Sequence, residues 1–311
     1  MRSIMLSDLL MYSSYFAPRG RMRMYVLGQQ LGERYLSPMD RLIGIVGDSG
    51  AGKSSLVKGL FPGLELTNDD DGVNIRPLPL LKNIDREFFS CHTYHMDARF
   101  ELAFTQLHVL ADAVTKALAH GKRVIVEHFD LLAPSLGTNA DVLIGVGGEV
   151  VVVRPTVFGP APQDLAAIVR KTLRYRKMAH TAEDLTARIL VQEYGAVLPF
   201  SHRDVHHGFV LEYGSKLDAD LKTVEARVKK LIDEGLSVCY SDETHILIGG
   251  DAWKCSGPRT HVSNTEDIEN FHLLPEYKYD PKTNTHLIIG LVGSSRDDLD
   301  GIAALGHAAS L

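Results

Sequence analysis

Residues 42–55, LIGIVGDSGAGKSS, join an unbroken apolar run to a glycine-rich stretch that ends in lysine and serine. The apolar run predicts a strand, and the residues that follow the glycines, SLVKGLF at 55–61, predict a helix. A strand that leads through a short loop into a helix is the repeating unit of an α/β sheet. This stretch therefore decides the fold class of the chain around it.

The loop between the predicted strand and helix has the spacing G-x-x-x-x-G-K-[ST] over residues 47–54, in the context that this phosphate-binding motif requires. Its glycines let backbone N–H groups turn inward around a triphosphate at a helix N-terminus, where the partial positive charge favours anions. Lys53 is expected to reach the β- and γ-phosphates, and the Ser54 hydroxyl to complete the shell of a Mg²⁺ ion. The residues expected to bind ATP or GTP are Gly47, Ser49, Gly50, Ala51, Gly52, Lys53, Ser54 and Ser55.

Acidic residues follow two other predicted strands. Phosphoryl transfer needs a carboxylate at a strand end, and Glu127 closes the strand RVIVE at 123–127. Asp69 and Asp70 follow a short predicted strand at 63–66, and one of them could accept the proton of a substrate hydroxyl. Each also has a structural interpretation, as a plain strand-end carboxylate or a solvated turn. The candidate catalytic residues are Lys53, Asp69, Asp70 and Glu127.

The composition limits the classes of protein to consider. The chain has 311 residues, enough for two domains, and its 45% hydrophobic and 23% charged residues are ordinary for a globular protein. A formal charge of −6 argues against a broadly basic nucleic-acid surface. Three widely spaced cysteines fit a reducing compartment, and no apolar run reaches the roughly 18 residues of a membrane span. A cytoplasmic protein that does not enter a membrane is expected.

The pattern along the chain divides it into three parts. Residues 1–40 predict a helical arm, and residues 41–160 alternate strands with helices, which predicts a mostly parallel, doubly wound sheet. FGPAPQD at 158–164 predicts a linker. Residues 164–311 mix strands and helices without a βαβ rhythm, which predicts an α+β domain.

The third part, residues 164–311, contains residues typical of metal ligands. Cys255 and His261 lie in the Gly/Pro-containing loop DAWKCSGPRTHVSNTEDI at 251–268, and thiolate and imidazole are good Zn²⁺ ligands that need partners from elsewhere. His180 and Asp184 are spaced to share one face of a helix. His202 and its neighbours His206 and His207 form a second candidate group, predicted to lie in a loop. The spacing alone also allows purely structural histidines.

Two family resemblances extend these interpretations. GIVGDSGAGKSS, at 44–55, and an acidic residue after the second strand resemble the P-loop kinases of the uridine kinase and phosphoribulokinase type. Residues 174–274 resemble the second additional, editing-type domain of threonyl- and alanyl-tRNA synthetases and of freestanding alanyl-tRNA editing proteins. Three blocks recur in order: RYRKMAHTAEDLTARIL at 174–190, HHGFVLEYGSKLDADLKTVEARVKKLIDEGLSV at 206–238 and KCSGPRTHVSNTEDIENFHLL at 254–274.

The second resemblance implies a zinc site and identifies two departures from the family pattern. Its implied ligands are His180, Asp184, Cys255 and His261, with Asp184 where the family has a second helix histidine. Arg259 and Thr260 lengthen the loop between the cysteine and the histidine. A carboxylate can still bind zinc, so the four residues remain a chemically sensible set. Whether zinc is bound stays open.

Together, the resemblances imply an ATP·Mg-dependent phosphotransferase or ATPase joined to a domain that recognises an amino acid, a nucleoside-like substrate or a tRNA acceptor end. One alternative is a trans-acting aminoacyl-tRNA deacylase with an accessory NTPase. Another is a non-catalytic nucleotide-dependent sensor. The basic stretch RKTLRYRK at 170–177 could close over phosphates, contact RNA through its arginines and Tyr175, or form a solvated helix face. The oligomeric state is not defined by the sequence.

Overall fold

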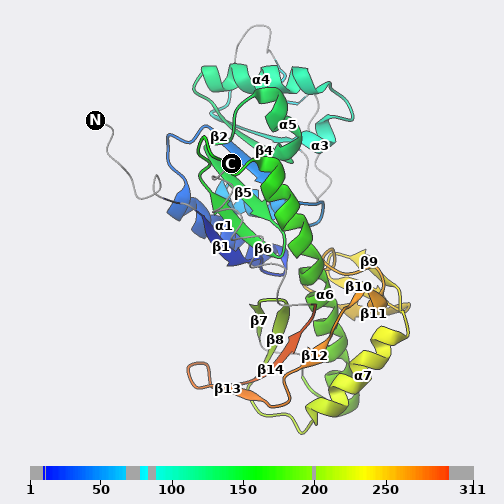
Figure 1. The fold of residues 1–311 in the computed structure, drawn as a ribbon. Helices are drawn as coiled ribbons and strands as arrows, with labels where there is room; N and C mark the ends of the chain where they lie inside the picture. The colour runs from blue at the N-terminus through cyan, green and yellow to red at the C-terminus, as the bar shows by residue number, and fades with distance from the viewer. Residues whose placement is uncertain (1–9, 11, 68–77, 83–88, 198–200, 294–311) are drawn as a thin grey trace. The chain divides into compact units, whose positions relative to one another are not determined.

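The computed structural model describes residues 10, 12–67, 78–82, 89–197 and 201–293, and it shows two compact units (Figure 1). The first is built mainly from Arg21–Lys171, and the second mainly from Pro18–Gly20 and the described residues between 172 and 293. Of the predicted features, the acidic turn with Asp69 and Asp70 lies outside the described residues. No described helix is both long and apolar enough to cross a membrane.

A six-stranded sheet forms the centre of the first unit, in the order β1-β6-β5-β2-β4-β3 (Figure 1). Four strands, β5, β2, β4 and β3, pair in parallel, whereas β6 and β1 join antiparallel. The strands are β1 (Ser13–Phe16), β2 (Leu42–Val46), β3 (Thr93–Asp97), β4 (Arg123–Glu127), β5 (Val142–Val146) and β6 (Glu149–Val153). The predicted α/β class is confirmed, but the sheet is mixed.

The mixed sheet corrects the prediction of a doubly wound parallel one. Only Gly147 and Gly148 separate β5 from β6, and so short a connection can join antiparallel strands but cannot make the crossover that parallel strands need. A second difference concerns residues 63–66, which belong to no strand. The strand that lies beside β4 is β3, so Asp97, at the end of β3, occupies the strand-end position that the sequence assigned to the acidic turn.

The segment predicted as a helical arm contributes a strand and a helix to the first unit. β1 adds to the antiparallel edge of the sheet, and α1 (Arg21–Tyr35) packs against α2 (Lys53–Leu60). The two helices cross so closely that a Cβ added at Gly59 would lie 2.0 Å from the Tyr25 carbonyl oxygen. A glycine is therefore required at this crossing, which fixes the helix that begins with Lys53.

Three further helices and part of a fourth complete the described helices of the first unit. The helical region before β4 is interrupted, giving α3 (Ala98–Glu101) and α4 (Leu107–Ala119). α4, α5 (Phe129–Leu136) and the beginning of α6 (Pro162–Tyr194) share one apolar core with the sheet. α6 continues into the second unit, where its residues from Thr172 onward belong.

The second unit combines helices with antiparallel sheets, as the α+β prediction expects (Figure 1). α6 and α7 (Leu221–Asp233) share an apolar core with its strands. The strands are β7 (Ser201–Val205), β8 (Gly208–Tyr213), β9 (Val238–Asp242), β10 (His245–Ile248), β11 (Asp251–Lys254), β12 (His272–Leu273), β13 (Lys278–Asp280) and β14 (Thr285–Leu291). The loop prediction around His202 is wrong, because His202 lies in β7, which pairs with β8.

Candidate functional site

The glycine loop of the first unit has the conformation that its motif predicts. It connects β2 to α2, and Gly50 and Gly52 adopt φ values of 77° and 99°. These values lie in the left-handed region that favours glycine over residues with a Cβ. α2 begins at Lys53, so the first N–H groups of this helix lack partners within it and can bind an anion.

Three of the predicted side chains meet at the end of this loop. Lys53 is buried, its Nζ donates a hydrogen bond to the Asp48 carbonyl oxygen at 3.0 Å, and it lies 3.9 Å from Glu127 Oε2. The Ser54 hydroxyl lies 3.5 Å from the same carboxylate oxygen. Lys53, Ser54 and Glu127 are therefore brought together from α2 and the end of β4, a spatial relation that the sequence spacing cannot show.

Glu127 is a buried carboxylate held in its charged form. Burial by itself raises the pKa of Glu127, but the hydrogen bond from His95 and the charge of Lys53 more than offset this effect. The net result is a pKa below the ordinary value for glutamate. A charged carboxylate at this position is suited to hold the water shell of a Mg²⁺ ion.

A second carboxylate, Asp97, was missed by the sequence analysis. It stands directly beside Glu127 in the register of β3 and β4, and its Oδ1 accepts a hydrogen bond from the Phe100 N–H at 3.0 Å. Burial and the Glu127 charge raise the pKa of Asp97. The only local signal was an acidic residue at the end of TYHMD, 93–97, a run with too many polar residues to predict a buried strand.

Two arginines bond to the outer part of the glycine loop. Arg99 donates to the Ser49 hydroxyl at 3.3 Å, and Arg170 donates to Asp48 at 3.1 Å. Both side chains supply positive charge where a triphosphate would add negative charge. Of the basic stretch 170–177, Arg170 and Lys171 belong to this unit, and Arg170 contacts the loop.

Residues 172–177 of the basic stretch lie in the second unit and do not form one solvated face. Tyr175 is buried and stacks on His207 with ring centroids 3.8 Å apart, so it is not available to stack on RNA. Arg174 lies over the Tyr175 ring, and Arg176 donates to the Pro18 carbonyl oxygen at 2.7 Å. The prediction of an RNA-stacking role for Tyr175 is therefore wrong.

The second unit brings all four predicted metal ligands together. Single ligand atoms from His180, Asp184, Cys255 and His261 all lie within 4.8 Å of one another. Cys255 Sγ lies 3.3 Å from His180 Nε2 and 3.2 Å from His261 Nε2, and Asp184 Oδ2 lies 3.6 Å from His261 Nε2. α6 supplies the first two residues on successive turns, and the loop after β11 supplies the other two.

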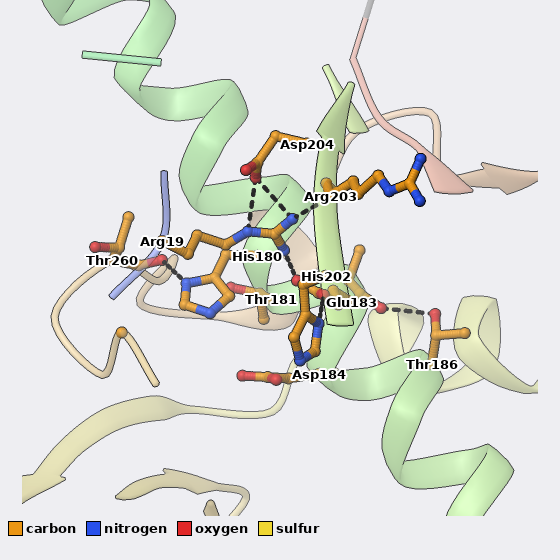
Figure 2. A network of polar contacts seen from close by, with 12 residues as sticks. Arg19, His180, Thr181, Glu183, Asp184, Thr186, His202, Arg203, Asp204 and Thr260 are labelled. Atoms are coloured by element: carbon orange, nitrogen blue, oxygen red, sulfur yellow. Dashed lines mark hydrogen bonds and ion pairs between the residues drawn. The ribbon is translucent and has the colours of Figure 1, made fainter. Parts of the chain in front are cut away.

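Hydrogen bonds around this cluster fix the orientation of both imidazoles. His180 Nδ1 donates to the Thr260 carbonyl oxygen at 3.0 Å (Figure 2). The Thr181 hydroxyl donates to the Lys177 carbonyl oxygen, so it accepts from His261 Nδ1 at 3.2 Å. Both Nδ1 atoms therefore carry the proton, and both Nε2 lone pairs point toward Cys255. Such outer hydrogen bonds typically orient histidines that bind a metal.

The buried polar atoms of the cluster fit a divalent cation. Asp184 Oδ2 is buried and makes no hydrogen bond to the described residues, and burial raises the pKa of Asp184 to about 7. Burial also raises the pKa of the Cys255 thiol and lowers the pKa of His261 to about 3. A bound cation would stabilise the carboxylate and the thiolate, which this apolar environment disfavours. Two nitrogens, one sulfur and one oxygen form a donor set that suits zinc.

A separate polar network lies beside these ligands (Figure 2). Arg19 forms ion pairs with Glu183 and with Asp204, and its Nε donates to Asp204 Oδ1 at 2.9 Å. His202 hydrogen-bonds to Glu183, so the structure places this predicted candidate in the network rather than among the four ligands. Arg19 was not predicted, because no local pattern connects it with residues more than 160 positions away.

A scan against protein-family models matches no family, and a search of curated proteins finds no match for this chain.

Proposed function

We propose that the first unit binds ATP with Mg²⁺ and transfers or hydrolyses its terminal phosphoryl group. The observation that carries this proposal is the convergence of Lys53, Ser54 and Glu127 at the end of a glycine loop that opens a helix. Loops of this kind cradle the phosphates of a nucleotide with their backbone N–H groups. ATP is preferred over GTP on the resemblance to small-molecule kinases.

The chain supplies a group for each requirement of phosphoryl transfer. Lys53 would exchange its bond to the Asp48 carbonyl oxygen for the β- and γ-phosphates, and Ser54 and Glu127 would hold a Mg²⁺ ion with its water. Bound Mg²⁺ neutralises charge on the phosphates. Arg99 and Arg170 add positive charge at the outer side of the loop.

Asp97 is the best-placed proton acceptor for a substrate hydroxyl. It lies at the end of β3, beside Glu127, and its raised pKa favours proton uptake relative to an ordinary aspartate. In the transfer, the substrate oxygen forms a bond to the γ-phosphorus, ADP leaves, and the hydroxyl proton passes to the Asp97 carboxylate. Amino acids and nucleoside-like compounds are the substrate classes that the resemblances imply.

The test is ATP consumption by the full chain, measured with Mg²⁺ across hydroxyl-containing amino acids, nucleosides and tRNA. Stimulation by one small hydroxyl compound, with its phosphorylated product detected by mass spectrometry, supports the kinase. ATP binding without turnover under any of these conditions supports the sensor instead. No ATP binding at all contradicts the proposal.

For the second unit, we propose a zinc-stabilised pocket that recognises an aminoacyl group or a tRNA end. The four-residue donor set and its two outer hydrogen bonds carry this second proposal. Catalytic zinc sites usually keep one position open for water, whereas four protein ligands close the coordination sphere. Recognition therefore fits this set better than hydrolysis. Cleavage of a mischarged tRNA by the purified chain without ATP would instead support the deacylase.

A further inference from the structure

His95 is a buried histidine in the middle of β3, and both of its ring nitrogens are within hydrogen-bonding distance of protein groups. Nε2 lies 3.2 Å from Glu127 Oε1. Nδ1 lies 3.2 Å from both the backbone nitrogen and the hydroxyl oxygen of Thr67. His95, Thr67 and Glu127 all lie outside the glycine motif, but Glu127 lies beside Lys53 and Ser54 of that motif.

The hydrogen bonds define which nitrogen of His95 carries the proton. A backbone N–H can only donate, so the Thr67 N–H requires an acceptor lone pair on His95 Nδ1. The neutral ring then carries its proton on Nε2, which donates to the Glu127 carboxylate. The Thr67 hydroxyl can donate to the His95 carbonyl oxygen at 3.3 Å, which further fixes the pair.

The two carboxylate oxygens of Glu127 consequently contact different groups. Oε1 accepts the proton of His95, whereas Oε2 faces Ser54 at 3.5 Å and Lys53 at 3.9 Å. Because His95 donates to Oε1, rotation of the Glu127 carboxylate away from the loop would break this buried hydrogen bond. Such a loss is costly, because it leaves a buried polar group without a partner.

We propose that His95, held by Thr67, is a positioning residue that aims Glu127 at the nucleotide-bound Mg²⁺. This inference rests on the proposed nucleotide function of the first unit. The side chain of His95 hydrogen-bonds to Thr67 and Glu127, and Glu127 in turn lies beside the loop lysine and serine, so His95 acts through Glu127. In this role, His95 acts like the outer hydrogen-bonding residues that orient the ligands of protein-bound metals.

The experiment compares two substitutions of the same residue. His95→Leu fills the buried space and removes the donor to Glu127, whereas His95→Gln keeps an N–H donor on a side chain of similar reach. The Mg²⁺ dependence of ATP binding is measured by calorimetry, and kcat and KM for ATP are measured separately. We expect His95→Leu to weaken the Mg²⁺ dependence and lower kcat by about 10–100-fold. His95→Gln should recover most of this loss.

A second readout needs no ATP. Nitrogen-resolved NMR of the ligand-free protein should show His95 as the neutral tautomer protonated on Nε2, and the imidazole signal should change when Glu127 is replaced by glutamine. A signal from Nδ1-protonated His95 would overturn the inference even if His95→Leu does not fold.

The possible outcomes separate this inference from the proposed function. A wild-type chain that neither binds nor turns over ATP removes the proposed function and the role of His95 with it. A wild-type chain that binds Mg·ATP, together with a folded His95→Leu variant of unchanged Mg²⁺ dependence and kcat, removes only the role of His95. Reduced thermal stability with unchanged Mg²⁺ dependence counts against it in the same way.

Discussion

The two units each bury a carboxylate among histidines, and they treat it in opposite ways. Glu127 has a lysine and a histidine donor beside it, and these groups hold its pKa below the ordinary value. Asp184 is grouped with two imidazoles and a thiol whose ligand atoms lie within 4.8 Å of one another, and burial raises its pKa to about 7. The comparison shows that groups of the chain itself, Lys53 and His95, keep the Glu127 carboxylate in its charged form. Asp184, whose charged form burial disfavours, would gain stability from a bound cation.

The largest expected effect follows from the removal of Lys53, the positive partner of Glu127. Lys53→Ala should lower ATP turnover by about 10³-fold, because it removes a charge-assisted contact to the phosphates at a site with little solvent. Steady-state ATPase or kinase assays and calorimetric ATP binding measure the loss. Lys122→Ala, in the same unit but outside the loop, is the matched control. Equal activity of Lys53→Ala and the control would remove Lys53 from the site.

Replacement of Cys255, the soft candidate ligand, should weaken metal binding by the four-residue cluster of the second unit. Cys255→Ser is expected to reduce zinc from about one ion per purified chain to a small fraction, and to lower the melting temperature, because metal binding stabilises the folded state. Elemental analysis and thermal unfolding measure both effects. Cys239→Ser replaces an exposed cysteine of the same unit and should change neither. Identical zinc content in the two variants would show that Cys255 is not a ligand.

The role of Asp97 is tested by Asp97→Asn. This change keeps the acceptor for the Phe100 N–H but removes the proton-accepting carboxylate, so kcat should fall by about 10²-fold while ATP affinity changes little. Pre-steady-state and steady-state kinetics with the identified substrate separate the two. A full kcat in this variant would transfer the base role to another residue.

The smallest expected effect concerns the pH dependence of the metal-free second site. The folded-state pKa of Asp184 lies above its unfolded value, so protonation stabilises the fold. This contribution is complete below about pH 4 and is lost as pH rises through about 7. Chelator-treated protein should therefore melt a few degrees lower at pH 8 than at pH 5.5, after correction with Asp184→Asn. A wild-type curve with the same pH slope as the variant would contradict this assignment.

The sequence predicted the parts of both sites that depend on local spacing. The glycine loop, the strand-end Glu127 and the helical pair His180 and Asp184 all follow from motif or periodicity, and the structure places them as expected. His95 and Asp97 could not be found this way. Their strand is half polar, and His95 is hydrogen-bonded by Thr67 and Glu127, which are distant from it in sequence.

Topology explains the remaining misses in the fold. β1 has only four residues and gains its partners from β6, more than 130 positions later, so no local pattern marks it as part of the sheet. The reversal between β5 and β6 depends on a two-residue connection, which an apolar pattern does not reveal. In the same way, β7 was hidden by its charged residues and by His202, because their partners lie in β8 and in the Arg19 network, far away in sequence.

The most direct test of the account is calorimetric titration of the full chain with ATP and with AMP, each with and without Mg²⁺. The geometry of Lys53, Ser54 and Glu127 predicts about one ATP per chain, tighter binding with Mg²⁺, and AMP affinity weaker by at least about 10²-fold, because AMP lacks the β- and γ-phosphates. Equal affinity for ATP and AMP, with no dependence on Mg²⁺, would contradict a phosphate-binding role for this loop.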